Sequence, residues 1–347
     1  LGIANLVVRE KSILEERYAG EFDYILCVGV LHHLADPAAA LAILSAALRP
    51  RGVLELMVYN RYHRSGCMAF QEAIRRLCGD STTDFALALE LARKTFAQYP
   101  PHDRLSAFVR VSESDALFAD TFLQPVEHAF TVASLDILAR GCGLELLQPR
   151  PADWDRAWNH GRSWNLHFED ETVRRRYLEL SDIDRWQVAN LILGEDSPLL
   201  WFYLQRADCG QPRRTERELG ADFLGAVFER RTTQKTSFLR GAGGVYRLGR
   251  ESRSHPAVPA DEESQRVWAA VDGSAAMADV MRRLGMQSDH ETINRLRLGL
   301  ATSACPHLGF LRDGTAHQAQ ERDSQMPPRR PESATRKPLT LEREVRS

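Results

Sequence analysis

The stretch that decides the fold runs from Phe22 to Asn60 and reads FDYILCVGVLHHLADPAAALAILSAALRPRGVLELMVYN. Its first part, FDYILCVGV, is an almost unbroken apolar run, which is typical of a strand that is covered on both faces of a sheet. Two adjacent histidines, His32 and His33, follow at the turn after this strand. Since ligands of open α/β sheets bind beyond the carboxyl ends of the strands, we expect a small-molecule site at this turn.

A helix and a second strand follow the turn. Asp36 and Pro37 predict the helix start, because a capping carboxylate precedes a proline at the first helical position. Leu41, Leu44 and Leu48 recur at spacings of three and four and give this helix one core-facing stripe. RPRG then ends the helix, and VLELMVY predicts the next strand. Strand, helix and strand with short links predict a parallel, right-handed unit.

Further elements flank this unit. The segment NLVVREKSIL, from Asn5 to Leu14, is rich in β-branched and apolar residues and predicts a strand. The hydroxyl of Thr131 predicts the start of the helix VASLDILAR, which GCG ends. LELLQP and the run from Pro198 to Arg206 predict two more strands. These elements place the first part of the chain in the α/β class.

The pattern of elements divides the chain into four parts. The α/β domain covers residues 1–206, and two insertions in it are expected to form a cap over the site. A linker with one short helix separates it from a small, mostly helical C-terminal module, and a polar, proline-bearing tail is expected to be disordered. The insertions are residues 61–130 and 150–197, the linker is 207–257, the C-terminal module is 258–312 and the tail is 313–347.

Composition excludes several classes of protein. The chain has 347 residues, of which 44% are hydrophobic, and a formal net charge of -2, which argues against a protein that coats nucleic acid or anionic lipid. Its six cysteines are scattered without a CxxC pair, so a disulfide framework and a zinc site are not expected. There is neither an apolar run of about 18 residues nor a signal-peptide pattern. We therefore expect a cytoplasmic protein without a membrane span.

The stretch from Phe22 to Tyr59 resembles the second half of a class I S-adenosylmethionine-dependent methyltransferase. The apolar strand, the VLHH turn, the Asp-Pro helix start, the LRPRG turn and the next apolar strand occur in the order of that family. Arg51 stands where the family typically has the first glycine of its turn. The segment DTFLQPVEHAFTVASLDILARGCGLELL also resembles the family. The resemblance covers roughly residues 1–206.

The resemblance implies a fold, a reaction and a cofactor. The fold is a Rossmann-like sheet of seven strands in the order 3-2-1-4-5-7-6, and the reaction is methyl transfer from S-adenosyl-L-methionine to a small-molecule or peptide acceptor. The chain begins at Leu1 just before the third strand of that order, and no G-x-G occurs between Leu1 and Val30. We therefore expect an N-terminally truncated methyltransferase with a partial sheet, unpaired sheet edges and impaired activity.

The resemblance also implies which residues contact the cofactor. Ser12 stands where the family usually has an aspartate for the adenine amino group, and Ile13 is placed to pack on the adenine ring. Cys27, Val28 and Gly29 would present backbone beside the methionine moiety. A glycine lets a ligand approach the main chain closely because it has no Cβ. The alternative for Cys27 is that its side chain is a small apolar group that only packs in the core.

His32 and His33 are candidates for the general base, because an imidazole titrates near neutral pH. The alternative is that each ring caps backbone groups or packs on the sheet. Adjacent histidines point in different directions, so no metal site is expected here. Further candidates for the acceptor site, for which surface or capping roles remain open, are Asp115, Asp120, Glu127 and His128. Three tryptophans could form a substrate wall or anchor the second insertion: Trp154, Trp158 and Trp164.

The C-terminal module is similar to the small winged-helix domains that bind leader peptides in peptide-modifying pathways. Between Val258 and Arg312 it carries seven acids and six arginines, whereas a protein that reads a DNA groove normally has a basic surplus. We therefore expect no nucleic-acid partner. An alternative function stays open, in which the chain is a non-catalytic remnant that acts as a binding protein through this module. The sequence does not indicate an oligomeric state.

Overall fold

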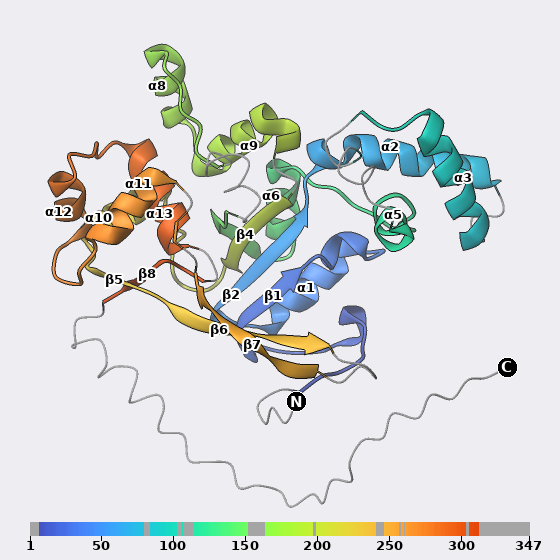
Figure 1. The fold of residues 1–347 in the computed structure, drawn as a ribbon, viewed down its shortest axis with the longest axis horizontal. Coiled ribbons are helices and arrows are strands. Elements are labelled where there is room, and N and C mark those ends of the chain that lie inside the picture. The colour runs from blue at the N-terminus through green and yellow to red at the C-terminus, as the bar shows by residue number, and fades with distance from the viewer. Residues whose placement is uncertain are drawn as a thin grey trace, which may run out of the picture. The chain divides into compact units, whose positions relative to one another are not determined.

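A four-stranded sheet is the centre of the fold (Figure 1). The structure is a computed structural model, and residues up to Phe310 form one compact unit. The strands run in the order β1-β2-β4-β3 and are β1 (Phe22–Val28), β2 (Leu48–Tyr59), β3 (Leu144–Pro149) and β4 (Leu199–Arg206). The structure describes residues 7–79, 84–102, 106, 114–151, 164–196, 199–240, 246–256, 258–259, 261–302 and 305–311.

The first two strands and the helix between them confirm the parallel unit. β1 pairs in parallel with β2, and α1 (Pro37–Ala47) connects them. A carboxylate oxygen of Asp36 accepts a hydrogen bond of 2.9 Å from the backbone N–H of Ala39, so this side chain caps α1 as predicted. RPRG is extended and belongs to β2. A Cβ on Gly52 would lie 2.8 Å from the carbonyl oxygen of Phe22, so only glycine lets the two strands approach here.

β4 lies between β2 and β3 and is antiparallel to both. This arrangement agrees with the 4-5-7-6 part of the strand order that the methyltransferase resemblance implies, and the α/β class is confirmed. The helix α6 (Val132–Gly141) precedes β3. The side chain of Thr131 accepts from the N–H of Ser134 at 3.1 Å, and Ser134 accepts from the N–H of Thr131 at 2.9 Å, so the predicted cap is a reciprocal capping box.

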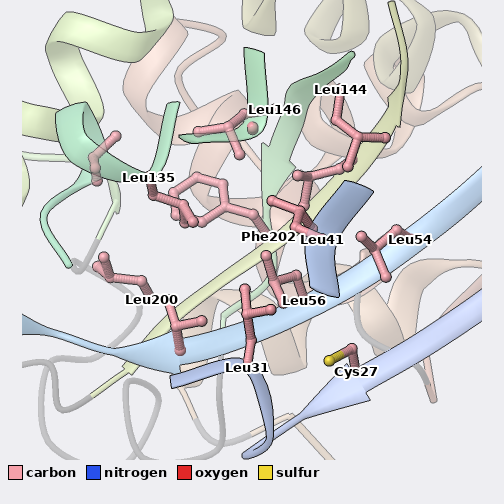
Figure 2. Packing of buried hydrophobic residues seen from close by; sticks show 14 of the residues in the cluster. Cys27, Leu31, Leu41, Leu54, Leu56, Leu135, Leu144, Leu146, Leu200 and Phe202 are labelled. Carbon is pink, nitrogen blue, oxygen red and sulfur yellow. The ribbon is translucent and has the colours of Figure 1, made fainter. Parts of the chain in front are cut away.

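The main core lies on the face of the sheet that α1 and α6 cover. Figure 2 shows Leu41 of α1 and Leu135 of α6 packed near Leu54, Leu56 and other leucines around a central phenylalanine. These four leucines and the phenylalanine, Phe202, are fully buried. Burial of one such side chain is worth about 1.5–3 kcal/mol, so this layer supplies much of the driving force for folding. The predicted leucine stripe of α1 is confirmed at Leu41.

Two expectations about the N-terminal part are wrong. The predicted strand from Asn5 to Leu14 is not a strand in its described part, because residues 7–12 have no regular structure and Ile13–Glu15 form the short 3-10 helix η1. β1 is not covered on both faces either. Tyr24 and Leu26 are 50% and 60% exposed, whereas Cys27 is buried. The described residues place a strand on only one side of β1, so apolar character alone did not indicate burial.

The insertion of residues 61–130 builds a helical layer with its own core. Its described helices are α2 (Arg61–Cys78), α3 (Phe85–Gln98) and α5 (Asp115–Phe122). Four aromatic rings, whose centroids lie between 5.0 and 5.8 Å apart in the contacting pairs, fill the space between these helices. The rings belong to Phe70, Phe96, Phe118 and Phe122. The insertion is therefore a small packed body rather than a loop.

The second insertion carries α8 (Glu171–Glu179) and α9 (Asp182–Leu193). Trp164 is buried in the main core, where its ring centroid lies 5.0 Å from that of Phe202. Of the two alternatives for the tryptophans, Trp164 therefore anchors the insertion. Trp154 and Trp158 lie outside the described residues.

The expected linker is structured instead. Residues 207–257 contain α10 (Glu216–Gly225), β5 (Phe228–Arg230) and a hairpin of β6 (Thr233–Arg240) and β7 (Tyr246–His255). Phe223 and Phe228 are buried in the same cluster as the helices of the C-terminal module. Phe223 gives α10 a core-facing side chain and Phe228 does the same for β5, and the sequence interpretation overlooked both.

The C-terminal module has three helices and a short strand, in agreement with its helical pattern. They are α11 (Glu262–Ala270), α12 (Met277–Arg283), α13 (His290–Ala301) and β8 (Leu308–Phe310), which pairs with β5. Leu298 of α13 belongs to the core of the main sheet, and the hydroxyl of Tyr203 donates to the carbonyl oxygen of Thr302 at 2.8 Å. These contacts join the module to the sheet. The whole of the predicted disordered tail, residues 313–347, lies outside the described residues.

Candidate active site

The candidate site lies at the carboxyl ends of the two parallel strands. β1 ends at Val28, and Gly29 follows with a φ of +73°, a left-handed conformation that favours glycine. The 3-10 helix η2 (Leu31–His33) then carries both histidines. β2 ends at Tyr59 on the same edge of the sheet. Because parallel strands end together, side chains from two distant segments meet here.

His32 is fully buried beneath this edge. Its ring stacks on the ring of Tyr59 with a centroid distance of 3.8 Å, and neither ring nitrogen has a hydrogen-bond partner among the described residues. Burial lowers the pKa of His32 to about 3, and the neighbouring His33, Arg64 and His128 contribute to this shift. His32 is therefore neutral at physiological pH and is a poor proton acceptor.

His33 has a different environment from its neighbour. It is half-buried, and its Nδ1 lies 3.2 Å from the carbonyl oxygen of Val126. A carbonyl oxygen only accepts hydrogen bonds, so Nδ1 carries the proton and Nε2 of the neutral ring is an acceptor. Its ring also meets the Tyr59 ring edge-on at a centroid distance of 5.5 Å. Of the two histidines, His33 is the one with a hydrogen-bonded ring and partial exposure, and its role as a general base stays a prediction.

A buried ion pair borders the histidines. Arg64 of α2 donates to Glu127 at 2.7 Å, and their side chains are only 5% and 1% exposed. The guanidinium of Arg64 lies 4.4 Å from the centroid of the Tyr59 ring. The side chain of Gln71 donates to the same carboxylate at 3.1 Å. This network connects the first insertion to the end of β2, so the insertion and the candidate site share a boundary.

The other acceptor-site candidates have structural contacts. Asp115 pairs with Arg93 at 2.6 Å on the surface, and Asp120 accepts from Gln124 at 2.9 Å. The backbone N–H of His128 donates to the carbonyl oxygen of His32 at 2.8 Å, which places His128 directly beside the buried imidazole. Of the four candidates, Glu127 and His128 therefore lie at the candidate site.

Ser12 and Ile13 lie on the approach to β1. The hydroxyl oxygen of Ser12 accepts from the N–H of Leu14 at 3.3 Å and caps η1. Ile13 is half-buried and packs against the main core. The contacts of both residues with an adenine ring remain a prediction. The capping hydrogen bond gives Ser12 a structural role that the sequence did not indicate.

Cys27, Val28 and Gly29 form the tip of β1. Burial raises the pKa of the Cys27 thiol to about 11, so this side chain is a neutral member of the core and only its backbone faces the sheet edge. Gly29 leaves open space, since an added Cβ would meet only Met57 at 3.8 Å. A bound cofactor could reach the main chain here. These residues fit one wall of a nucleotide cofactor site.

Several residues of the site were missed in the sequence interpretation. Tyr59 contacts both histidines, and Arg64 neutralises Glu127. The position of Tyr59 at the end of a strand parallel to β1 was a usable signal, because such ends meet at one edge. Arg64 lies one turn into a helix, and nothing in its local sequence indicates that it is buried.

Comparison with known proteins gives the class of the domain. Residues 3–108 match the family model described as a methyltransferase domain. An uncharacterized protein of Synechococcus sp. is 35% identical over 178 residues, which are 50% of this chain and 41% of that protein. A ubiquinone biosynthesis O-methyltransferase of Psychrobacter cryohalolentis is 36% identical over 75 residues, which are 21% of this chain and 29% of that enzyme. The chain thus spans less than half the length of these curated relatives.

Solved structures give weaker likenesses. PKMT2 from Rickettsia typhi has a TM-score of 0.47 and 12% identity, covering 87% of this chain and 60% of that protein. Its complex with AdoHcy has the same TM-score and 14% identity, covering 82% of this chain and 56% of that protein.

The family match supports a methyltransferase domain in residues 3–108, which include the tip of β1 and η2. It indicates S-adenosyl-L-methionine as the cofactor of that domain. Among the described residues, no group of three or more His, Cys, Asp and Glu side chains is arranged to hold a metal ion. In the part of the chain that the structure covers, every helix falls short of the length and apolar character that a membrane span needs.

Proposed function

We propose that this chain transfers a methyl group from S-adenosyl-L-methionine to a small-molecule or peptide acceptor. The observation that carries the proposal is the match of residues 3–108 to a methyltransferase domain, which contains the histidine-bearing turn and most of the described first insertion. When bound, the cofactor supplies an electrophilic methyl group on its sulfonium. Placing the acceptor in line with that methyl group is then the main task of the protein.

Each residue of the site receives a role in this proposal. The main chain at Gly29 forms one wall of the cofactor site, because it has no side chain to block the approach. Nε2 of His33 accepts a proton from the acceptor, since Val126 holds the proton on the other nitrogen. His32 and Tyr59 form a rigid aromatic floor beneath them. The helices of the first insertion close the acceptor side.

The test is transfer of a radiolabelled methyl group by the full chain to components of a cell extract. Replacement His33→Gln is expected to lower the transfer rate about 10²–10⁴-fold, which is the usual contribution of a general base. His102→Gln is the matched control, because His102 is an exposed histidine of the first insertion. Equal rates in both variants would remove the base role from His33. Neither transfer nor cofactor binding in the unmodified chain would remove the enzymatic function.

A non-catalytic binding function is the second candidate. The observation that favours it is that the hydroxyl of Ser12 caps η1, so this predicted cofactor contact already has a structural role. Under this candidate the C-terminal module is winged-helix-like, with α11, α12 and α13 followed by β8, and it binds a peptide. Calorimetric detection of S-adenosylmethionine binding to the full chain would count against this candidate.

A further inference from the structure

A polar cavity lies among the helices of the second insertion and the C-terminal part of the chain. It has a volume of about 410 Å³, which is within the range of small-molecule sites. Its lining comes from α8 and the turn after it, from α9, from α10 with the segment before it, and from α13. The residues are Leu178, Leu180, Ser181, Asp182, Arg185, Arg213, Thr215, Arg217 and His290.

The two acids of this region are buried, and every one of their carboxylate oxygens accepts a hydrogen bond. Asp182 and Glu216 are 5% and 2% exposed. One carboxylate oxygen of Asp182 pairs with Arg185, and the other accepts from Arg213 at 2.8 Å and from the N–H of Glu216 at 2.9 Å. Glu216 accepts from Arg185 at 3.0 Å, and its second oxygen accepts from Trp186 and Asn294, each at 2.9 Å.

Of the three arginines that line the cavity, Arg185 is only 8% exposed and pairs with both acids, whereas Arg213 and Arg217 keep accessible surface. Arg217 is exposed and makes no ion pair with any described residue. Arg213 uses Nε and one terminal nitrogen internally, at 2.7 Å to the carbonyl oxygen of Leu146 and 2.8 Å to Asp182, and its side chain keeps 19% of its surface. Nε2 of His290 makes no hydrogen bond with a described residue and lies 3.8 Å from a carboxylate oxygen of Glu216. The open side of the cavity therefore presents donors and positive charge.

The lining residues carry a net positive charge. Three arginines, at positions 185, 213 and 217, face one aspartate, so the sum is +2 when His290 is neutral. Counting the adjoining carboxylate of Glu216 leaves +1. α9 begins at Asp182, α10 at Glu216 and α13 at His290, so three helix N-termini also point toward this region. Each adds partial positive charge.

We propose that this cavity binds a phosphate group, either as inorganic phosphate or on a small organic molecule. A phosphate has oxygens that point in several directions, which suits donors that come from three different helices. Arginine is the side chain best suited to such recognition, because its planar guanidinium offers several donors in a fixed geometry. A ligand here would bridge α9 of the second insertion and the helices α10 and α13, which pack on each other.

Calorimetric titration of the full chain tests the proposal. The probes are inorganic phosphate, glycerol 3-phosphate and, as the uncharged reference, glycerol. We expect saturable binding of phosphate with a Kd below about 1 mM. Tighter binding of glycerol 3-phosphate would assign the site to an organic phosphate, and equal or tighter binding of inorganic phosphate would assign it to the free ion. The absence of saturable binding of both would overturn the proposal.

Two pairs of variants separate the cavity from general charge effects. Arg217→Ala is expected to weaken phosphate binding about 5–10-fold, and Arg217→Glu to abolish it. Arg282→Ala and Arg282→Glu are the matched controls, because Arg282 of α12 is 75% exposed and does not line the cavity. Equal losses in both pairs would contradict a localised site. Thermal melting with and without phosphate shows that each variant is folded and measures the same binding independently.

Discussion

Two buried polar clusters of this protein differ in how their groups are satisfied. Around Asp182 and Glu216, all four carboxylate oxygens have hydrogen-bond partners. At the tip of β1, the imidazole of His32 is equally buried and has none among the described residues. A satisfied buried network adds to a unique, rigid fold, whereas an unsatisfied buried group opposes stability. The difference indicates that the inner carboxylates of the first cluster stabilise the fold, and it supports the proposal that the second cluster belongs to a cofactor site.

The position of each cluster agrees with this interpretation. Asn294 of α13 donates to Glu216 of α10, and Arg213 donates to the backbone of β3, so the first cluster holds the C-terminal helices on the sheet. His32 lies where the two parallel strands end, which is the edge at which open α/β sheets bind ligands. The comparison makes three predictions, given from the largest effect to the smallest.

The largest effect is expected in the satisfied cluster. Glu216→Ala would leave Arg185, Trp186 and Asn294 without their acceptor and is expected to lower the free energy of unfolding by about 3–5 kcal/mol. Asp222→Ala on the same helix removes a surface pair with Arg214 and is expected to change it by less than about 1 kcal/mol. Urea unfolding at pH 7 measures both. Similar losses in the two variants would show that the network has no special role.

The next effect concerns the pH dependence that His32 creates. Its pKa is about 3 in the folded protein, below the ordinary value of 6.5, so the unfolded chain binds a proton first as the pH falls. Above pH 6.5 the proton equilibrium of His32 therefore does not lower the free energy of unfolding. As the pH falls from 6.5 toward 3, this free energy decreases by at most about 1.4 kcal/mol per pH unit. His32→Phe keeps a ring on Tyr59 and removes the titration.

Unfolding curves at pH 6.5 and pH 4.5 test this prediction. Between these values the natural protein is expected to lose up to about 3 kcal/mol more than His32→Phe. His102→Phe serves as the control, because it makes the same replacement at an exposed histidine. If His32→Phe and the natural protein lose equal stability, His32 is hydrated or hydrogen-bonded, and the contrast between the clusters disappears.

The smallest effect tests whether the turn that carries the histidines is ordinary scaffold. Asp36→Ala removes the cap of α1 and is expected to lower the free energy of unfolding by about 1 kcal/mol. Asp23→Ala is the control, because its pair with Arg49 is exposed and its loss is expected to leave the free energy of unfolding nearly unchanged. A loss well above 2 kcal/mol for Asp36→Ala would mean that the cap also holds the histidine turn in place.

The elements with strong local signals could be predicted from the sequence. The Asp36-Pro37 start, the Thr131 cap and the strands around them have local causes, namely a capping oxygen, a fixed proline φ and continuous apolar runs. The order of the sheet came from the resemblance to methyltransferases. For the candidate site, the sequence predicted its location at the edge of the sheet and the two histidines. It also included Glu127 and His128 in a longer set of candidates.

Features that depend on distant contacts could not be predicted. The exposure of Tyr24 and Leu26 depends on which segments lie against β1, and the same apolar run would serve equally in a covered strand. The different environments of His32 and His33 arise from Tyr59 and Val126, which are far away in the sequence. The linker interpretation failed because polar residues around α10 hid the apolar pair that enters the core, Phe223 and Phe228.

The most direct test of the proposed cofactor site is calorimetric titration of S-adenosylmethionine into the full chain and two glycine variants. Gly29 and Gly143 have φ angles of +73° and +72°, and an added Cβ would meet its nearest neighbour at 3.8 and 3.9 Å, so alanine strains both equally. We predict that Gly143→Ala binds the cofactor like the natural chain and that Gly29→Ala binds it at least about 10-fold more weakly. Equal affinities in the two variants, or no binding by the natural chain, would contradict the assignment of the β1 tip as the cofactor wall.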